Sequence, residues 1–203
     1  MKLYDYATAP NPRRVRIFLA EKGVDVPLET VDILKRESRA HAFVEKNPFG
    51  GSPVLELDDG TCIAESVAIC RYIEGVHPEP PLFGRTPVEQ ALVDMWLRRL
   101  DLYLMWPIGQ VWIHDHPLTK SLGQQVKEAA DIGRKGAERT YRILDAELSG
   151  RDFIAGESYT VADAVALATI DFGVDLVGVP YDDDLTNLKT WHESMKARPS
   201  AKA

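Results

Sequence analysis

The sequence is short of cysteine and of long apolar runs, and each shortage excludes a class of protein. Only Cys62 and Cys70 occur among the 203 residues, and their spacing matches neither a CxxC motif nor a metal-ligand pattern. We therefore expect two reduced, mostly buried thiols, with no disulfide framework and no bound metal. The longest apolar stretch, residues 162–170, contains Asp163 and is well short of the roughly 20 residues that span a bilayer. No membrane-spanning segment is predicted.

Charge of one sign is not concentrated in any part of the chain. Acidic residues outnumber basic ones by 31 − 24 = 7, and the excess is spread over both halves. This distribution does not indicate a nucleic-acid-binding surface. Asp5 stands where a signal peptide would need its apolar core, so we expect a cytoplasmic protein.

Strand and helix patterns alternate over about the first 75 residues. Residues 2–6 alternate as in a short strand, and Pro10-Asn11-Pro12 then opens a helix that Gly23 ends. The alternation continues with a strand candidate at 26–33, a short helical segment at 37–46, a hairpin of 53–57 and 61–64, and a helix from about Ser66. The order βαβαββα predicts an α/β domain with a mixed sheet.

The second part of the chain has a different character. The proline-rich stretch His77–Pro81 indicates a linker. Beyond it only helical patterns occur, at residues 89–105, 124–148, 160–172 and 184–196. We therefore predict a first domain at 1–77, a linker at 78–87 and an all-α domain at 88–203.

The order of three motifs in the first domain is informative. Ala9-Pro10-Asn11-Pro12 leads from a strand into a helix, Gly50-Gly51-Ser52-Pro53 precedes the hairpin, and Glu65-Ser66 opens the last helix. The capping-box sequence Thr160-Val161-Ala162-Asp163 follows in the helical domain. With this set, the chain resembles the cytosolic glutathione transferases over nearly its whole length, and the bacterial and fungal ones most. The resemblance implies a thioredoxin-like first domain and glutathione as co-substrate. It also implies a homodimer that conjugates glutathione to small hydrophobic electrophiles in detoxification.

The resemblance further implies how glutathione is held. A cis Ser52–Pro53 bond would leave the backbone of Ser52 free to pair with the cysteinyl part of glutathione. Glu65 and Ser66, at a helix N-terminus, would hold the ammonium and the carboxylate of the γ-glutamyl end. Arg39 resembles the cation that receives the glycine carboxylate. Without the family pattern, these residues would be interpreted as an ordinary trans proline, an N-cap and a solvated charge.

The residue that activates the glutathione thiol is less obvious, because the usual serine, cysteine or tyrosine donor is missing after the first strand. A free thiol ionises near pH 8.5, so its pKa must be lowered for catalysis near neutral pH. Between Tyr6 and Arg14 the polar candidates are Thr8 and Asn11. Tyr4 and Tyr6 are expected in the strand, as core or hydrogen-bonded residues. The arginines at 13, 14 and 16 are expected to form a solvated helix face whose positive field assists.

The helical domain contains a dense set of large side chains that indicates a core and, in part, a pocket for an apolar electrophile. They are Met95, Trp96, Tyr103, Met105, Trp106 and Trp112. His114-Asp115-His116-Pro117 is interpreted as a loop rather than a zinc site, since no further ligand cluster accompanies it. His114 remains a candidate donor toward the thiol.

Two other functions fit the same fold. One is a non-catalytic binding or regulatory protein, which the missing serine, cysteine or well-placed tyrosine favours. The other is a glutathione-dependent peroxidase or reductase, whose usual signature is a cysteine near position 11, where this chain has Asn11.

Overall fold

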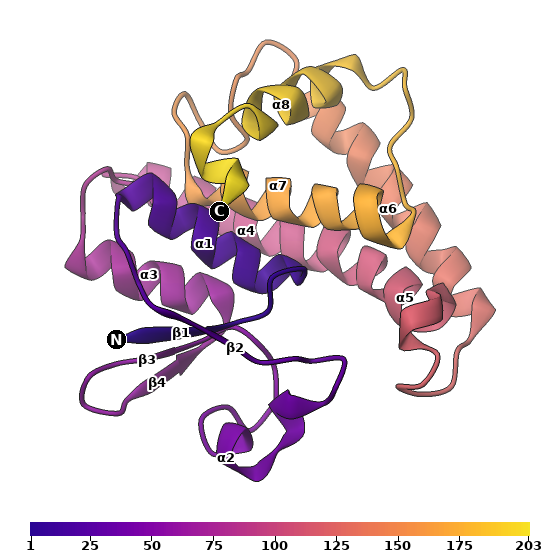
Figure 1. Ribbon diagram of the computed structural model, residues 1–203. Coiled ribbons are helices and arrows are strands. Elements are labelled where there is room, and N and C mark those ends of the chain that lie inside the picture. Colours follow the sequence, from indigo (N-terminus) through magenta and orange to yellow (C-terminus); the bar gives the residue numbers. More distant parts are fainter. The chain divides into compact units, whose positions relative to one another are not determined.

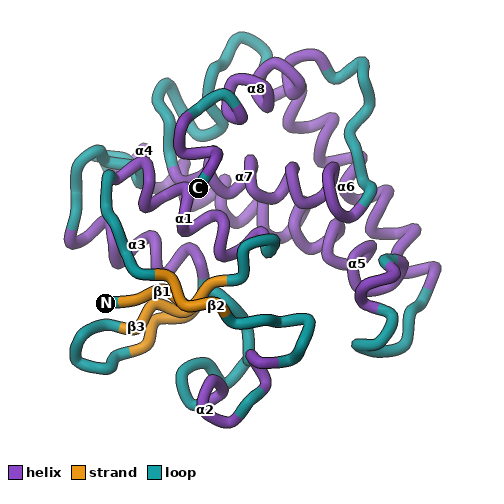
Figure 2. The backbone as a smooth tube through the Cα atoms, viewed as in Figure 1, coloured by secondary structure: helices purple, strands orange, loops and turns teal.

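The computed structural model describes all 203 residues, which divide into two compact units. The first comprises residues 1–82 together with the C-terminal residues 199–203, and the second comprises residues 83–198. Figure 1 shows the elements of each unit along the chain, and Figure 2 separates its helices, strands and loops. No helix in either unit combines the length and the apolar character that crossing a membrane requires.

The first unit contains one four-stranded mixed sheet and three α-helices. Its elements are β1 (Lys2–Asp5), α1 (Pro10–Lys22), β2 (Leu28–Thr30), α2 (His41–Val44), β3 (Val54–Glu56), β4 (Cys62–Ala64) and α3 (Ser66–Val76). The strand order is β2-β1-β3-β4, with β1 and β2 parallel and the other neighbours antiparallel. The predicted βαβαββα order and mixed sheet are confirmed.

The register of the strands brings several chain segments to one edge of this sheet. Val54 lies opposite Tyr4 on one side and Ala64 on the other, and Asp5 lies opposite Thr30. The ends of β1, β2 and β4 and the beginning of β3 therefore meet at the same edge. Helices α1 and α3 both start there. All residues predicted to contact glutathione lie on segments that enter or leave the sheet at this edge.

Helix α1 is more deeply buried than its sequence indicates. Gly23 ends it in the left-handed conformation, at φ 64°, as predicted. The expected solvated arginine face is wrong, because Arg14 is only 3% exposed and the side chain of Arg16 only 12%. The helix is covered by α3 and by the C-terminal turn Pro199–Lys202, so it has little free surface on which charges could be solvated.

The second unit consists of helices only, as expected. They are α4 (Pro87–Leu100), α5 (Trp106–Asp115), α6 (Lys127–Glu147), α7 (Val161–Asp171) and α8 (Thr186–Lys196), with π turns at Asp101–Met105 and Phe172–Val177. Side chains with almost no exposure, such as Leu104, Ile108 and Tyr141, form its core.

Helix α5 lies beyond the predicted helix 89–105, and it continues through Pro107 although proline lacks the N–H that a helix interior needs. The structure carries the chain through a π turn at Asp101–Met105 and on to Asp115. A regular helix would direct the N–H of residue 107 to the carbonyl of Tyr103. The Thr140 hydroxyl of α6 lies within hydrogen-bond distance of that carbonyl and supplies the missing donor. The helical prediction for 89–105 therefore stopped ten residues too early.

Two helix starts in this unit are closed by capping boxes. At α4, Thr86 and Glu89 each accept a hydrogen bond from the other's backbone N–H. At α7, Thr160 and Asp163 form the box that the sequence predicts. The Asp163 carboxylate is fully buried and also accepts from the Ile154 N–H at 3.0 Å and from the Trp191 indole N–H at 3.2 Å.

Candidate functional site

The loop before β3 is shaped by two side chains that bond its backbone. The buried Asn47 donates from Nδ2 to the Gly51 carbonyl at 2.8 Å and accepts from the Phe49 N–H at 3.1 Å. Arg39 donates from Nη1 to the Phe49 carbonyl at 2.9 Å. These bonds fix the chain just before the Ser52–Pro53 peptide.

The Ser52–Pro53 bond is cis, which confirms the prediction made from the proline motif. The Ser52 hydroxyl donates to the Tyr4 carbonyl at 3.2 Å, and β3 begins only at Val54. The backbone of Ser52 thus lies outside the strand ladder, beside the end of β1. Such a position suits strand-like pairing with a peptide ligand.

The start of α3 offers several backbone donors and an unusual backbone conformation. Glu65 has φ 69° and ψ 119°, a region that non-glycine residues seldom occupy, and its side chain makes no capping bond. The first backbone bond runs from the Ile69 N–H to the Glu65 carbonyl at 3.0 Å, so the amides of residues 66–68 have no partner within the helix. Ser66 is 6% exposed. The arrangement can receive a carboxylate at the amides and an ammonium at the Glu65 carboxylate.

The start of α1 is different, because prolines remove most of its donors. Pro10 and Pro12 have no N–H, so Asn11 supplies the only amide among the first three helical residues. The Arg13 N–H already donates to the Ala9 carbonyl at 3.3 Å. The Asn11 side-chain oxygen is buried and has no hydrogen-bond partner. This oxygen can only accept, so the hydrogen bonds that Asn11 can give to a sulfur anion come from its backbone and side-chain N–H groups.

Thr8, the other candidate donor for the thiol, and Tyr4, expected in the strand, lie in contrasting places. Thr8 is exposed in the turn between β1 and α1. The buried Tyr4 donates its hydroxyl to Glu56 at 2.6 Å, and Lys46 lies 2.8 Å from the same carboxylate. The hydrogen bonds from Lys46 and Tyr4 hold the pKa of Glu56 below its usual value. Tyr4 is thus a hydrogen-bonded structural tyrosine.

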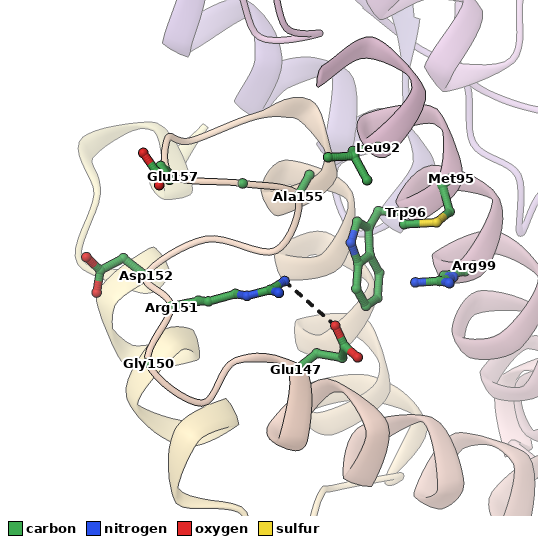
Figure 3. A pocket seen from close by; sticks show the side chains of 11 residues that line it. Leu92, Met95, Trp96, Arg99, Glu147, Gly150, Arg151, Asp152, Ala155 and Glu157 are labelled. Carbon is green, nitrogen blue, oxygen red and sulfur yellow. Dashed lines mark ion pairs between the residues drawn. The ribbon is translucent and has the colours of Figure 1, made fainter. Parts of the chain in front are cut away.

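A hollow of about 540 Å³ in the second unit lies between α4, the end of α6 and the loop that follows it (Figure 3). Of the large side chains predicted to line an apolar pocket, only Met95 and Trp96 line this hollow. Arg99 lies over the Trp96 ring at 4.9 Å from its centroid, and an Arg151–Glu147 ion pair of 3.7 Å stands opposite (Figure 3). Because the rim is charged, this hollow does not supply the apolar electrophile pocket, which stays a prediction.

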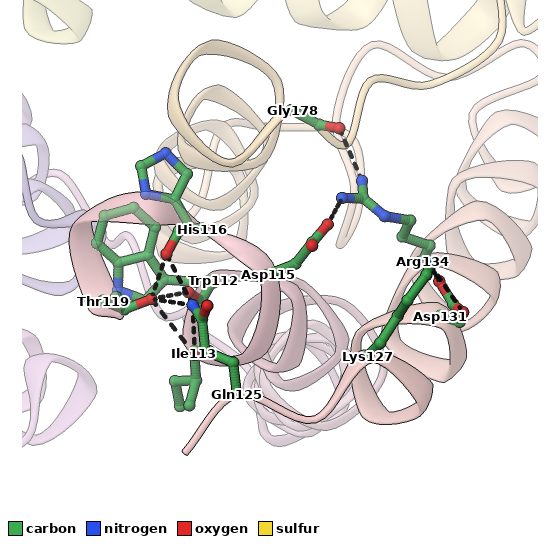
Figure 4. A network of polar contacts seen from close by, with 10 residues as sticks. All are labelled: Trp112, Ile113, Asp115, His116, Thr119, Gln125, Lys127, Asp131, Arg134 and Gly178. Carbon is green, nitrogen blue, oxygen red and sulfur yellow. Dashed lines mark hydrogen bonds and ion pairs between the residues drawn. The ribbon is translucent and has the colours of Figure 1, made fainter. Parts of the chain in front are cut away.

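His114 and His116 both bond the turn between α5 and α6, and Figure 4 shows His116 in that turn. His114 lies in the last turn of α5 rather than in the expected loop, and its Nδ1 accepts from the Val126 N–H at 3.4 Å. His116 Nδ1 accepts from the Leu118 N–H at 3.3 Å, and its ring packs on Trp112 with centroids 4.4 Å apart. The expectation of loop residues therefore holds for His116 and is wrong for His114, since α5 continues past Pro107.

Comparison with known proteins agrees with this geometry. The family model described as the glutathione S-transferase N-terminal domain matches residues 1–75, and the model of the C-terminal domain matches residues 101–199. The chain belongs to the glutathione S-transferase family, and glutathione is the co-substrate of this family.

Individual relatives match over the full chain. Glutathione S-transferase 2 of Saccharomyces cerevisiae is 35% identical over 100% of this chain and 88% of its own length. The crystal structure of Gtt2 from that organism is also 35% identical. It superposes with a TM-score of 0.94 and covers 100% of this chain and 99% of its own. A glutathione S-transferase domain-containing protein of Marinobacter aquaeolei is 38% identical, with a TM-score of 0.93 and coverage of 98% and 99%. FtsZ-localized protein A of Caulobacter vibrioides is 29% identical over 97% of this chain and 87% of its own.

Proposed function

We propose that this protein transfers the thiolate of glutathione to small hydrophobic electrophiles, as a detoxifying enzyme of the cytoplasm. The observation that carries the proposal is the meeting, at one sheet edge, of the cis Ser52–Pro53 segment, the open start of α3 and the proline-flanked start of α1. Each of the three supplies a different kind of contact, and glutathione needs all three kinds.

The binding residues divide the tripeptide among them. The backbone of Ser52 pairs with the cysteinyl unit, and Glu65 and Ser66 hold the ammonium and carboxylate of the γ-glutamyl end. Arg39, whose guanidinium makes one bond to the neighbouring loop, keeps further donors for the glycine carboxylate. This division places the thiol near the start of α1, where Asn11 lies.

Activation of the thiol requires that the thiolate be stabilised more than the thiol. The Asn11 amide and the partial positive charge of the helix end both favour the anion. Asn11 and Thr8 are the proposed side-chain donors. In the transfer step the sulfur forms the new bond to the electrophilic carbon, while the leaving group departs or the electrons move into the acceptor.

The direct test is a turnover assay with glutathione and a panel of aromatic halides, epoxides and hydroperoxides, paired with calorimetry of glutathione binding. We expect binding together with turnover of the halides or epoxides. Binding with no turnover of any compound would favour a binding or regulatory role, to which the missing serine or cysteine at the start of α1 also points. Turnover confined to hydroperoxides would favour a peroxidase.

We further propose a homodimer. Large apolar side chains are strongly exposed in both units, among them Phe49 at 80% and Trp106 at 66%. A dimer interface would remove side chains of this size from water. Sedimentation analysis at micromolar concentration should give twice the mass of 22.7 kDa, and a monomer would overturn this part of the proposal.

A further inference from the structure

We propose that Arg16 and Asp5 are positioning residues for thiol activation, acting through the loop that carries Thr8 and leads to Asn11. The inference rests on the proposed transferase function. It concerns the direction of the backbone N–H of Asn11. Neither the sequence pattern nor the family comparison assigns a residue that sets this direction.

Arg16 of α1 bonds two residues of the segment that leads from β1 into α1. The Arg16 guanidinium pairs through Nη1 with the Asp5 carboxylate, at the end of β1, and donates through Nη2 to the Ala7 carbonyl at 2.9 Å. Both ionic side chains are nearly buried, with exposures of 12% and 8%. One planar group therefore connects the strand end, the middle of the loop and the second turn of the helix.

Few other bonds hold this loop. Within it, the Ala9 N–H donates to the Tyr6 carbonyl at 2.9 Å, and the Arg13 N–H reaches back to the Ala9 carbonyl. The strand end is also fixed, because the Val31 N–H donates to the Asp5 carbonyl at 2.8 Å. The Arg16 contacts thus set how far the first turn of α1 stands from the sheet edge where glutathione is held.

The position of that first turn matters more here than in a helix with a full set of amides. Pro10 and Pro12 have no N–H to donate. If the helix end were displaced, no neighbouring N–H could take the place of the Asn11 N–H in the hydrogen bond to the glutathione sulfur. A small displacement of a catalytic donor costs a large fraction of its effect. The charge of Arg16 is matched by Asp5, so the pair acts by geometry rather than by its own field.

Arg16→Lys separates geometry from charge, since a lysine keeps the charge and can pair with Asp5 but cannot also reach the Ala7 carbonyl. The matched control is Arg13→Lys, on the same helix, which also keeps its charge and whose guanidinium donates to the Ala201 carbonyl at 3.1 Å. The measurements are the affinity for glutathione, kcat, and the pH titration of the ultraviolet absorbance of the bound thiolate. We expect Arg16→Lys to lower kcat about tenfold and to raise the pKa of the bound thiol, with affinity changed less than about twofold. Arg13→Lys should leave all three quantities near those of the parent.

A double-mutant cycle with Asn11→Pro, which removes the backbone N–H of residue 11 in the first turn of α1, tests whether Arg16 acts through that donor. If it does, Arg16→Lys should have little further effect on kcat once Asn11 is replaced. Independent, multiplying effects would overturn the inference, as would a lower melting temperature with an unchanged thiol pKa. Should Arg16→Lys fail to fold, Asp5→Asn takes its place in the same cycle. Absence of turnover and of a lowered thiol pKa in the parent protein would instead reject the transferase function itself.

Discussion

Two helices of each unit begin in opposite ways. In the second unit, α4 and α7 are each closed by a capping box from their own sequence. In the first unit, neither Ala9 before α1 nor Glu65 before α3 makes a side-chain cap. A closed start satisfies the orphan amides and stabilises the fold, whereas an open start leaves donors for a ligand. We infer that the two capped starts stabilise the fold and that the two open starts of the first unit receive the ligand.

The two open starts also differ from each other. The first three residues of α3 all carry amides, and those of α1 carry only that of Asn11. A carboxylate has two oxygens that accept several hydrogen bonds, while a thiolate is a single atom. We infer that α3 is built to hold a carboxylate tightly and α1 to direct one donor at sulfur.

The largest effect is expected at a closed start. Asp163→Ala leaves the buried N–H groups of Ile154, Thr160 and Trp191 without their acceptor. Each such loss costs about 1–3 kcal/mol, so the free energy of unfolding should fall by at least about 3 kcal/mol. Denaturant titration measures it, and a loss below about 1 kcal/mol would show that this start does not stabilise the fold.

The same carboxylate gives a pH dependence. Burial raises the pKa of Asp163 from 3.8 to about 6, despite the hydrogen bonds that oppose the shift. The folded state therefore takes up the proton at a higher pH than the unfolded state, and this group stabilises the fold most below about pH 4. That contribution is lost as the pH rises through about 6. Relative to Asp163→Asn, the parent should gain unfolding free energy between pH 7 and pH 4, and a difference that stays flat or shrinks would contradict the raised pKa.

A substitution at the open start of α3 should change the affinity for glutathione rather than the stability of the fold. Ser66→Ala removes a hydroxyl proposed to hold a buried carboxylate, and we expect glutathione binding to weaken by about 1–3 kcal/mol. Thr86→Ala is the matched change at a closed start and should cost about 1 kcal/mol of stability with no change in affinity. Calorimetric titration and thermal unfolding of both variants decide the matter. If Ser66→Ala lowered stability and left affinity unchanged, Ser66 would be a cap only.

The second open start should respond in turnover. Asn11→Ala and Thr8→Ala should each lower kcat about tenfold to a hundredfold, less than the loss of a donor in a site that depends on it alone. The backbone amide of residue 11 remains in both variants, so part of the thiolate stabilisation persists. Steady-state kinetics with a fixed electrophile provide the measurement. A fall beyond a thousandfold in either variant would identify one indispensable side chain.

The smallest effect is expected at Tyr6, which follows β1 directly and is not part of either helix start. Tyr6→Phe should change kcat less than about twofold and leave the pKa of the bound thiol in place. The pH titration of the thiolate absorbance is again the readout. A thiol pKa that rises toward its free value in Tyr6→Phe alone would assign activation to a tyrosine.

Features that depend on neighbours in sequence could be predicted well. The αL end of α1 at Gly23, the capping box at Thr160 and the hairpin around residue 59 all follow from short local patterns, and each is present. The sheet edge at which the proposed glutathione residues meet also follows, once the strand order is known. The cis bond before Pro53 could be predicted only because the surrounding motif resembles a family.

Features that depend on distant partners could not be predicted. Arg16 lies among three arginines that suggest a solvated face, and only the folded chain brings it to Asp5 and Ala7. The start of α8 is capped by Asp145 of α6, which accepts from the Asn187 and Leu188 N–H groups at 2.8 and 3.0 Å, rather than by the nearby acidic run 182–184. In both cases the local charge pattern suggests solvation, while a long-range contact provides the partner.

The Thr140 hydroxyl that replaces the missing donor of Pro107 has a consequence for the order of folding. The Tyr103 carbonyl finds its partner 37 residues further along the chain, whereas in an isolated helix of residues 87–115 water would have to supply that donor. We therefore expect the π turn to become fully ordered only once α6 docks against it. Docking and completion of the helix then form one cooperative step, so amide hydrogens on either side of residue 103 should become protected from exchange together with those of α6.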